Sequence, residues 1–438
     1  MLKIALINHG CAKNLVDSEL MLGMLADAGY KITLDEEEAN VVIINTCSFI
    51  HDAEQESVQS ILRMIYTGKK VIVTGCLPQK HKEELKKAIP EVIAMLGTTD
   101  YSKIVDVIKN LEYNDDNYIE KISEKPKYIY AENVTRQQIT MGASSYLKIA
   151  DGCNFQCGYC IIPQLRGKYS SRKIEDIVSE AKEMANKGVA EIVLIAQDTT
   201  SYGIDLYGEP KLAQLLKELS KIDNLDWIRI MYTYPSMFND ELIDTIANLD
   251  KVVKYIDIPL QHSNPQMLES MRRPVFDYRE LIQKLRDKIP NLALRTTFIV
   301  GYPGETDEQF NDLYKFVEEM KFDKMGVFEY SREENTASYS MKHQIPEKLK
   351  TCRKEKLMEL QSKISLEINK SLIGRKIPCI IEALTQEGVV IARTYRDAPE
   401  IDGVCYINTD MPLVPGDIET VEIIDADEYD LWGKVCEQ

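Results

Sequence analysis

Three closely spaced cysteines in "ADGCNFQCGYC" (residues 150–160) are the feature that most constrains what this chain can fold into. Cys153, Cys157 and Cys160 follow the spacing C-x₃-C-x₂-C. A structural zinc site takes four ligands, and a disulfide framework takes an even number of cysteines. A four-iron cluster normally takes one thiolate per iron, so three cysteines leave one iron open. The spacing favours a short loop that wraps such a cluster, with Tyr159 shielding it.

Two other interpretations of this loop remain open from the residues alone. A zinc ion could recruit a distant fourth cysteine, or the three thiols could be incidental buried side chains. A zinc knuckle usually pairs two short C-x₂-C units, and the sequence contains no second pair of that kind.

A second set of three cysteines lies in the N-terminal part of the chain. Cys11, Cys47 and Cys76 each follow the carboxyl end of a predicted β-strand, at residues 3–8, 40–46 and 70–75. A fourth strand is predicted at 92–96, and helical patterns separate the strands, so an open parallel α/β sheet is expected. The carboxyl ends of such strands line one crevice, where the three thiols can meet. They indicate a second four-iron cluster, although cysteines at strand ends are also common as small buried hydrophobic residues.

The middle of the chain repeats the alternation of strands and helices. Six strand candidates lie at 144–150, 190–197, 227–234, 255–260, 293–300 and 324–331. Six such units predict an incomplete (β/α)₆ barrel, in which the chemistry is expected at the carboxyl ends of the strands. The loop with Cys153 follows the first of these strands and so belongs to that end.

A long helix is predicted over 346–372, and five short strands from Gly374 onward predict a small antiparallel, OB-like barrel. The expected domains are residues 1–112, a linker at 113–138, a core with its linking helix at 139–371, and the small barrel at 374–438. The fold class is therefore α/β plus all-β.

Composition limits the setting in which the chain works. No basic segment followed by an apolar stretch marks a secretory signal, and the longest apolar run, "VVIINTCSFI", is too short to cross a membrane. A cytoplasmic protein with no membrane partner is expected. The ten cysteines in a reducing compartment favour metal or redox chemistry for those that cluster. A formal net charge of −17 argues against a broad nucleic-acid footprint.

The loop spacing resembles that of the radical S-adenosylmethionine (radical SAM) superfamily, and nearly the whole chain resembles a methylthiotransferase. The matching stretches are "GCAKNLVDSE", "INTCSFI", "GCLPQ", "GCNFQCGYCIIPQLRGKYSSR", "QDTTSYGIDLYG", "DIPLQH", "RTTFIVGYPGET" and "FEYSREENT". "CAKNLVDSE", "QDTTSYGIDLYG" and "APEIDG" resemble the RimO-type branch, which modifies an aspartate of the ribosomal small-subunit protein S-twelve. The family order is an N-terminal cluster domain, a radical SAM barrel and a TRAM barrel.

The resemblance implies a transferase with two [4Fe-4S] clusters that uses S-adenosylmethionine (SAM) both as methyl donor and as radical source. A 5′-deoxyadenosyl radical would remove hydrogen from the aspartate β-carbon, which would then receive a methylthio group from the N-terminal cluster. A low-potential electron donor is implied. The first cluster would be held by Cys11, Cys47 and Cys76, and the radical SAM cluster by Cys153, Cys157 and Cys160.

Other residues carry over less directly. By analogy with the superfamily, Gln197 and Gly301 are expected to touch SAM, although "GYPGE" is equally explained as a turn that opens a helix. Arg166, Lys168 and Arg172 could hold a carboxylate, but exposed loop charges usually face solvent. The chain departs from the family pattern at His9, Ala12 and Tyr302, none of which alters a cysteine.

The substrate has two candidates within the family. The MiaB-type branch carries the same chemistry to an adenosine of transfer RNA, and RNA binding depends on Lys and Arg that neutralise phosphates. Residues 374–438 contain five basic and fourteen acidic side chains. This balance favours a basic protein such as S-twelve, free or in the ribosomal subunit, over nucleic acid. A remote alternative is a non-enzymatic iron–sulfur or zinc scaffold that binds RNA.

Overall fold

The computed structural model describes residues 2–113, 118–128, 130, 136–139, 142–385, 388–409 and 411–436. The chain divides into two compact units. The first comprises Met1–Thr140, Ala150–Gln156 and Cys160–Ser170, and the second comprises Met141–Ile149, Cys157–Tyr159 and Ser171–Gln438.

The first unit is built on a six-stranded, all-parallel sheet in the order β2-β1-β3-β4-β5-β6. The strands are β1 (Lys3–Asn8), β2 (Lys31–Ile32), β3 (Val41–Thr46), β4 (Lys70–Gly75), β5 (Ala94–Leu96) and β6 (Ile119–Lys121). Every residue of β3, "VVIINT", is buried, as is typical of a central parallel strand covered on both faces. The predicted parallel α/β arrangement is confirmed.

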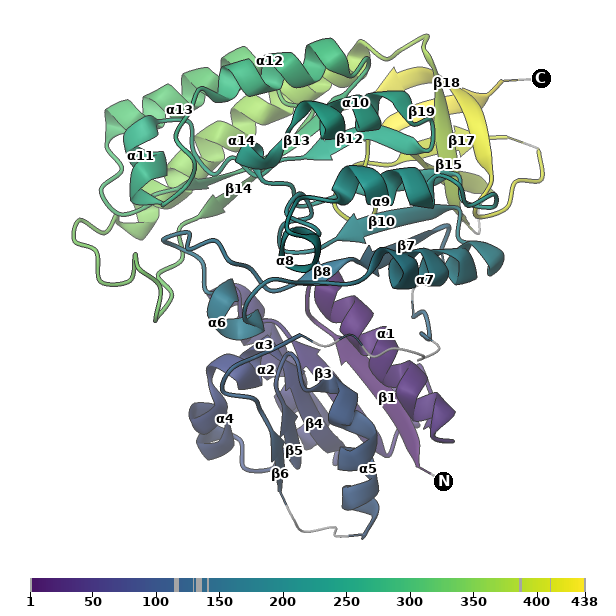
Figure 1. Cartoon of the computed structure of the whole chain (residues 1–438), viewed down its shortest axis with the longest axis vertical. Helices are drawn as coiled ribbons and strands as arrows, with labels where there is room; N and C mark the ends of the chain where they lie inside the picture. Colours follow the sequence, from purple (N-terminus) through teal and green to yellow (C-terminus); the bar gives the residue numbers. More distant parts are fainter. Residues whose placement is uncertain are drawn as a thin grey trace. The chain divides into compact units, whose positions relative to one another are not determined.

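Helices cover both faces of this sheet. Figure 1 shows α1 and α5 on one face and α2 and α4 on the other. The helices are α1 (Ala12–Asp27), α2 (His51–Tyr66), α3 (Cys76–Lys80), α4 (Lys82–Ala88), a 3₁₀ turn (Tyr101–Lys103) and α5 (Ile104–Tyr113), with α6 (Ile162–Arg166) in the later segment of the unit. The core on the α2 side includes Val42, Ile44, Ile61 and Val73.

Two short edge strands, β2 and β6, were not expected from the sequence. β6 lies within the stretch predicted to be a linker, and it pairs with β5 from Ala94 to Leu96. With only two and three residues, these strands carry too short a pattern to stand out from a polar connection.

The second unit contains the predicted series of six parallel strands, in the order β14-β13-β12-β11-β10-β7. They are β7 (Ser144–Lys148), β10 (Glu191–Ile195), β11 (Trp227–Ile230), β12 (Val252–Asp257), β13 (Ala293–Val300) and β14 (Lys324–Glu329). Each strand pairs with the next in chain order, so the open (β/α)₆ barrel is confirmed. β8 (Ala150–Asp151) and β9 (Ser170–Ser171) form a small separate sheet that brackets the cysteine loop.

Helices follow the strands of this sheet and lie along its outer side (Figure 1). They are α7 (Ile174–Asn186), α8 (Ile204–Tyr207), α9 (Leu212–Leu219), α10 (Asp240–Asn248), α11 (Pro265–Ser270), α12 (Tyr278–Lys288), α13 (Asp307–Met320) and α14 (Glu347–Lys370), with a 3₁₀ turn at Pro235–Met237. α14 is the long polar helix predicted between the core and the small barrel.

The C-terminal strands close into the predicted small barrel, in the order β15-β16-β17-β19-β18. They are β15 (Lys376–Leu384), β16 (Val389–Thr394), β17 (Cys405–Asn408), β18 (Ile418–Ala426) and β19 (Leu431–Val435). One pair, β17 with β19, runs parallel, whereas the other pairs are antiparallel. The parallel pair arises because β19 lies between β17 and β18. The chain forms β18 first and then returns antiparallel to it, beside β17.

Buried ion pairs join this small barrel to the strands of the six-stranded parallel sheet within the second unit. Arg393 of β16 pairs with Glu191, the first residue of β10, and donates to Ser144 Oγ at 2.8 Å. Arg229 pairs with the same carboxylate at 2.7 Å. Ser144 and Glu191 each begin a strand, so the small barrel occupies the amino ends of the strands and leaves the carboxyl ends to the cysteine loop. In the described part of the chain, no helix has the length and apolarity needed to span a membrane.

Candidate metal centre

The N-terminal cysteines occupy equivalent positions in three successive strand–helix units. Cys11 is the residue before α1, Cys47 follows the last residue of β3, and Cys76 begins α3 directly after β4. Because β1, β3 and β4 are adjacent parallel strands, their carboxyl ends bring the three thiols to one edge of the sheet. The sequence prediction that these cysteines share an edge is in agreement with this arrangement.

A buried polar network links the three cysteine-bearing segments. Asn14 accepts from Cys11 Sγ at 3.4 Å and donates to Asn45 Oδ1 at 3.0 Å and the Thr46 carbonyl at 3.2 Å. Thr46 Oγ1 in turn donates to the Thr74 carbonyl at 2.6 Å and accepts from Leu77 N–H at 3.3 Å. These groups are buried and hydrogen-bonded, so they hold the loops rigidly. Through these hydrogen bonds, Asn14 near the start of α1 helps to orient the loops that carry all three cysteines.

The thiols have unequal electrostatic surroundings. Burial raises the pKa of Cys76 to about 12 in spite of the nearby Arg166. Burial also raises the pKa of Cys47. Loss of water around Cys11 acts in the same direction, but the positive charges of Lys13 and Arg166 outweigh it and lower the pKa of Cys11. Cys11 also raises the pKa of Cys47, and both of these thiols raise the pKa of Cys76.

Gly75, between β4 and Cys76, has a backbone conformation that other residues rarely adopt. Its φ is 96°, and a Cβ there would lie 2.6 Å from the Thr46 carbonyl oxygen and closer still to Asn45 Oδ1. Only glycine therefore allows α3 to begin with Cys76 pressed against the end of β3.

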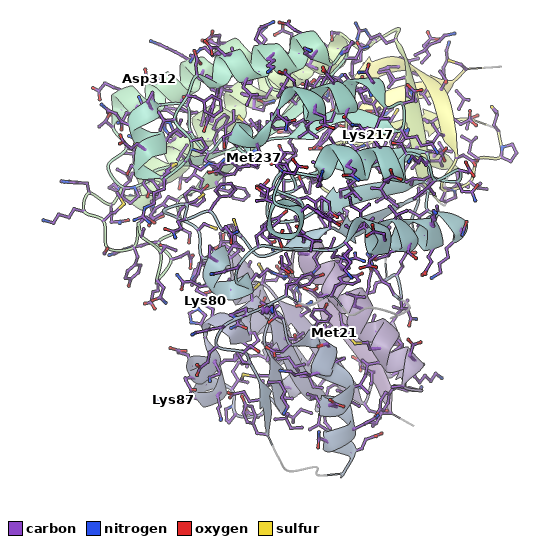
Figure 2. The ribbon with its side chains drawn as sticks, in the orientation of Figure 1. Met21, Lys80, Lys87, Lys217, Met237 and Asp312 are labelled. Atoms are coloured by element: carbon purple, nitrogen blue, oxygen red, sulfur yellow. The ribbon has the colours of Figure 1, made fainter. Side chains whose placement is uncertain are left out.

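A second ionic cluster supports the loop after Cys47. Glu54 of α2 accepts from Ser48 Oγ and from Lys80 Nζ at 2.6 Å, and it lies 3.2 Å from His81 Nε2. Figure 2 labels Lys80, which ends α3. Burial opposes ionisation of Glu54, but these partners lower its pKa to about 2. The carboxylate thus fastens the Cys47 loop to the helix that begins with Cys76.

The C-x₃-C-x₂-C loop is shared between the two units. Cys153 and Cys160 belong to the first unit and Cys157 to the second, and chain connectivity keeps all three within one loop. Directly after Cys160, Ile161 and Leu165 of the α6 segment pack against Cys76. The segment that follows the second cysteine set is therefore part of the wall around the first set.

Arg166, at the end of α6, is the buried centre of a charge network. It is only 2% exposed, and its Nη1 lies 2.7 Å from Asp151 and 3.1 Å from Asp17. Its Nη2 donates to Asn14 Oδ1 at 2.9 Å, so it reaches the network beside Cys11. The expectation that the loop charges face solvent is wrong for Arg166, because two carboxylates compensate its burial.

The other two charges of that loop differ from each other. Arg172 is buried, pairs with Glu180 at 2.7 Å and donates to the Lys148 carbonyl at 2.8 Å. Lys168 is exposed, as expected. Local sequence could not separate these cases, since the partners of Arg172 lie in other elements.

The segment around Cys157 is held by backbone hydrogen bonds in the second unit. Gly158 N–H donates to the Met271 carbonyl at 2.8 Å, and the Gly158 carbonyl accepts from Ser338 N–H at 2.9 Å. Tyr159 is partly buried against an apolar cluster that includes Met271 and Tyr302. Tyr159 is thus fixed beside the loop, where shielding was expected.

Arg273 contacts a cysteine of this loop directly. Its Nη1 lies 3.9 Å from Cys157 Sγ, its Nη2 donates to the Pro259 carbonyl at 2.6 Å, and its guanidinium lies 4.2 Å from the centre of the Tyr234 ring. The sequence analysis did not identify Arg273, since "SMRRPVF" has no local pattern that distinguishes a buried arginine from an exposed one.

Both donor sets consist of cysteines, the side chains that bind the irons of an iron–sulfur cluster. Among the residues with described positions, no three His, Cys, Asp or Glu side chains lie close enough to hold one metal ion. A four-iron cluster separates its thiolates farther than one zinc ion does, because each cysteine binds a different iron. The buried Nε of Arg273, which has no hydrogen-bond partner in the described chain, also suits an anionic group at Cys157.

The two residues expected to touch SAM lie at carboxyl ends of strands. Gln197 comes two residues after β10 and is partly buried. Gly301 follows β13 with φ at 72°, and its N–H donates to Glu305, so that amide is already engaged. Glu305 also pairs with Arg353 at 2.9 Å, and His262 Nε2 lies 3.4 Å from it. The "GYPGE" segment precedes α13, whose first turn is capped by Thr306.

Sequence comparison identifies three family matches along the chain. The Radical SAM superfamily matches residues 147–317, the Uncharacterized protein family UPF0004 matches residues 3–97, and the TRAM domain matches residues 373–436.

Curated relatives match over almost the full length. The "Ribosomal protein uS12 methylthiotransferase RimO" of Caldanaerobacter subterraneus subsp. tengcongensis is 50% identical, covering 99% of this chain and 100% of the relative. The proteins of the same name from Rippkaea orientalis and Clostridioides difficile are each 46% identical, covering 98% and 99% of this chain and 96% and 99% of their own.

Solved structures share the fold at low identity. The radical S-adenosylmethionine methyltransferase TsrM from Kitasatospora setae, with cobalamin and a [4Fe-4S] cluster bound, gives a TM-score of 0.56 at 15% identity, covering 77% of each chain. The cobalamin-dependent radical enzyme OxsB gives 0.51 at 12% identity, covering 82% of this chain and 56% of its own.

Proposed function

This chain belongs to the RimO family of ribosomal protein uS12 methylthiotransferases, and on that premise we propose that it replaces a hydrogen on an aspartate β-carbon of uS12 with a methylthio group. The chain is a radical SAM transferase. The observation that carries the proposal is the presence of two separate three-cysteine sets, each at the carboxyl ends of parallel strands. A reaction that needs both a radical source and a sulfur donor requires two separate metal centres, and each three-cysteine set could hold one.

Membership of the radical SAM superfamily implies one [4Fe-4S] cluster and SAM. When bound, that cluster supplies the electron that cleaves SAM to a 5′-deoxyadenosyl radical. We assign its ligands to the loop at the mouth of the core, Cys153, Cys157 and Cys160. The hydrogen bonds of Gly158 to Met271 and Ser338 fix the loop before anything binds. A preformed loop loses little conformational freedom on binding a cluster.

We assign a second [4Fe-4S] cluster to the N-terminal set, Cys11, Cys47 and Cys76. The convergence of three adjacent strand ends supports this role, because it brings the three thiols to one edge of the sheet. The buried thiol of Cys76 would become a thiolate ligand when the positive charge of the metal compensates the negative charge of its sulfur. Asn14 and Thr46 hold the surrounding loops, and Gly75 allows the close approach of α3.

We propose that Gln197 and Gly301 line the SAM site at the ends of β10 and β13. Gly301 acts through shape, because its amide is occupied by Glu305. Glu305 is oriented by Arg353 and lies beside His262, so the turn is held from two other elements. Such second-layer contacts keep a binding loop in one geometry.

The small barrel favours a basic protein partner over transfer RNA. Three of its acidic side chains, Asp397, Glu400 and Asp402, and two of its basic ones, Arg393 and Arg396, are used in contacts with the radical SAM core. Removing them from both counts leaves eleven acidic and three basic side chains in residues 374–438. The excess of negative charge survives this correction, and it repels phosphate while attracting a basic ribosomal protein.

We further propose the domain limits 1–112, 113–138, 139–371 and 374–438. A ribosomal substrate, a low-potential electron donor and a reducing cytoplasm complete the proposed setting. The family matches at 3–97, 147–317 and 373–436 support these limits.

A competition assay under strict anaerobiosis tests the function. The protein is reconstituted with iron and sulfide and supplied with reductant, SAM, purified uS12 and bulk transfer RNA. Mass spectrometry is expected to find a methylthio group in place of hydrogen on an aspartate of uS12. Modification of the RNA instead, with uS12 unchanged, would overturn the substrate, and cleavage of SAM without any methylthiolation would overturn the reaction.

A further inference from the structure

We infer that Arg273 is a positioning residue of the radical SAM centre, which supplies the counter-charge to the Cys157 thiolate and thereby sets how readily the bound cluster accepts an electron. The inference rests on the proposed role of Cys157 as a cluster ligand. Arg273 acts through this cysteine and is not itself assigned a bond-making step.

The local backbone aims Arg273 at the cysteine loop. α11 ends at Ser270, and Arg272 then adopts φ of 56°, in the left-handed region. Arg273 N–H closes the turn by donating to the Leu268 carbonyl at 2.8 Å. Met271, in the same turn, accepts from Gly158. The helix end therefore contacts the cysteine loop twice, through its backbone at Gly158 and through a guanidinium at Cys157.

Arg273 is buried but lacks the partner that a buried arginine normally has. Arg273 is 8% exposed. Within the described part of the chain, no carboxylate lies within ion-pairing distance of its guanidinium. Its charged and titratable neighbours are Cys157 and the tyrosines at 159, 234 and 278. The other buried arginines discussed above, Arg166, Arg172, Arg229, Arg353 and Arg393, each pair with at least one carboxylate.

An isolated buried charge is strongly unfavourable unless an opposite charge compensates it. The thiolate of Cys157 and the cluster it would hold are the anionic groups within reach. A positive charge and an N–H donor at a cluster sulfur stabilise the more negative, reduced state. The guanidinium should therefore make reduction easier than it would be in an uncharged site.

The test isolates the radical SAM cluster and measures its reduction directly. In a parent protein with Cys11, Cys47 and Cys76 changed to Ala, only the loop set remains to bind iron. Four proteins are reconstituted anaerobically: this parent, and the parent with Arg273→Met, Arg273→Lys or Arg272→Gln. Arg273→Met keeps the stem that packs on Tyr234, and Arg272→Gln is the matched control because Arg272 is an exposed neighbour. Iron and sulfide content, the electron paramagnetic resonance spectrum and the midpoint potential are recorded without SAM.

Arg273→Met is expected to bind iron normally, but its ratio of reduced to oxidised cluster at the parent midpoint should be at least tenfold lower, which corresponds to about 59 mV for a one-electron couple. Arg273→Lys should recover most of this shift, and Arg272→Gln should show none. If Arg273→Met binds little iron, the Arg273→Lys variant becomes the test. A normal iron content and midpoint potential in Arg273→Lys would support the role of the positive charge, and a loss of iron equal to that of Arg273→Met would overturn the inference. An unchanged midpoint in Arg273→Met overturns the inference alone. A parent that binds no cluster overturns the proposed function, and the inference falls with it.

Discussion

Replacing Arg166 with Met should destabilise the N-terminal unit severely. The substitution removes the positive charge of Arg166 from beside Asp17 and Asp151, which are buried at 3% and 1% exposure. Breaking a buried ion pair by removing one member typically costs about 3–5 kcal/mol. The same change removes the donor to Asn14 at 2.9 Å, for which the loss of a charge-assisted hydrogen bond adds about 1–3 kcal/mol. Against a typical domain stability of about 5–15 kcal/mol, this loss is large.

Hydrogen exchange measures the effect where it should occur. A chain of several domains does not unfold in one step, so the exchange free energies of amides in α1 and β3 are more informative than a melting temperature. Both elements carry residues of the Asn14 network. We expect their exchange free energies to fall by about 3 kcal/mol or more, while amides in the C-terminal barrel remain unchanged.

A charge-balanced variant provides the control. Combining Arg166→Met with Asp17→Asn and Asp151→Asn removes the cation and both anions, and should restore most of the lost stability because no uncompensated charge remains. A loss below about 1 kcal/mol in the single variant would refute the reasoning, as would a triple variant no more stable than the single one.

Three further predictions follow from individual contacts. Burial opposes ionisation of Glu191, but Arg229 and Arg393 hold its pKa at about 2, below the usual 4.5. Its contribution, about 3 kcal/mol, should thus be complete above pH 4.5 and be lost as the pH falls toward 2, and Glu191→Gln should flatten the acid limb of unfolding curves. Gly75→Ala should cost about 1–3 kcal/mol and lower the iron bound by the N-terminal cysteines. Changing the N-terminal cysteines to Ala should spare SAM cleavage but abolish methylthiolation, whereas changing the loop cysteines should abolish deoxyadenosine formation; methylthiolation surviving the first change would contradict the assigned sulfur donor.

The sequence predicted the strands well because most of them are buried on both faces and read as continuous apolar runs. "VVIINT" at β3 is an example, with all six residues buried. The same rule fails for β6, where "IEK" carries two charges and only three residues pair with β5. Its place in the sheet comes from the neighbouring strand and not from its own composition.

Local sequence spacing was enough to place the cysteines of the candidate site but not its buried arginines. Each cysteine could be placed after a strand, and adjacency of parallel strands then implied convergence. Arg166 and Arg273 could not be placed in this way, because each has a partner that is remote in sequence: Asp17 is 149 residues from Arg166, and Cys157 is 116 residues from Arg273. A buried arginine and an exposed one have the same local sequence signal when the contacts that bury them are remote.

The two arginines give the two cysteine sets different electrostatic surroundings. Arg166 lies near Cys11 and Cys76, but it also pairs with Asp17 and Asp151, so carboxylates balance part of the charge that it brings to that site. Arg273 pairs with no carboxylate in the described chain, so no carboxylate balances the charge that it places 3.9 Å from Cys157 Sγ. A centre that must accept an electron benefits from such a charge, whereas a centre that holds a nucleophilic sulfur loses reactivity beside one. The division of roles proposed for the two sets is therefore consistent with the charges that the fold places beside them.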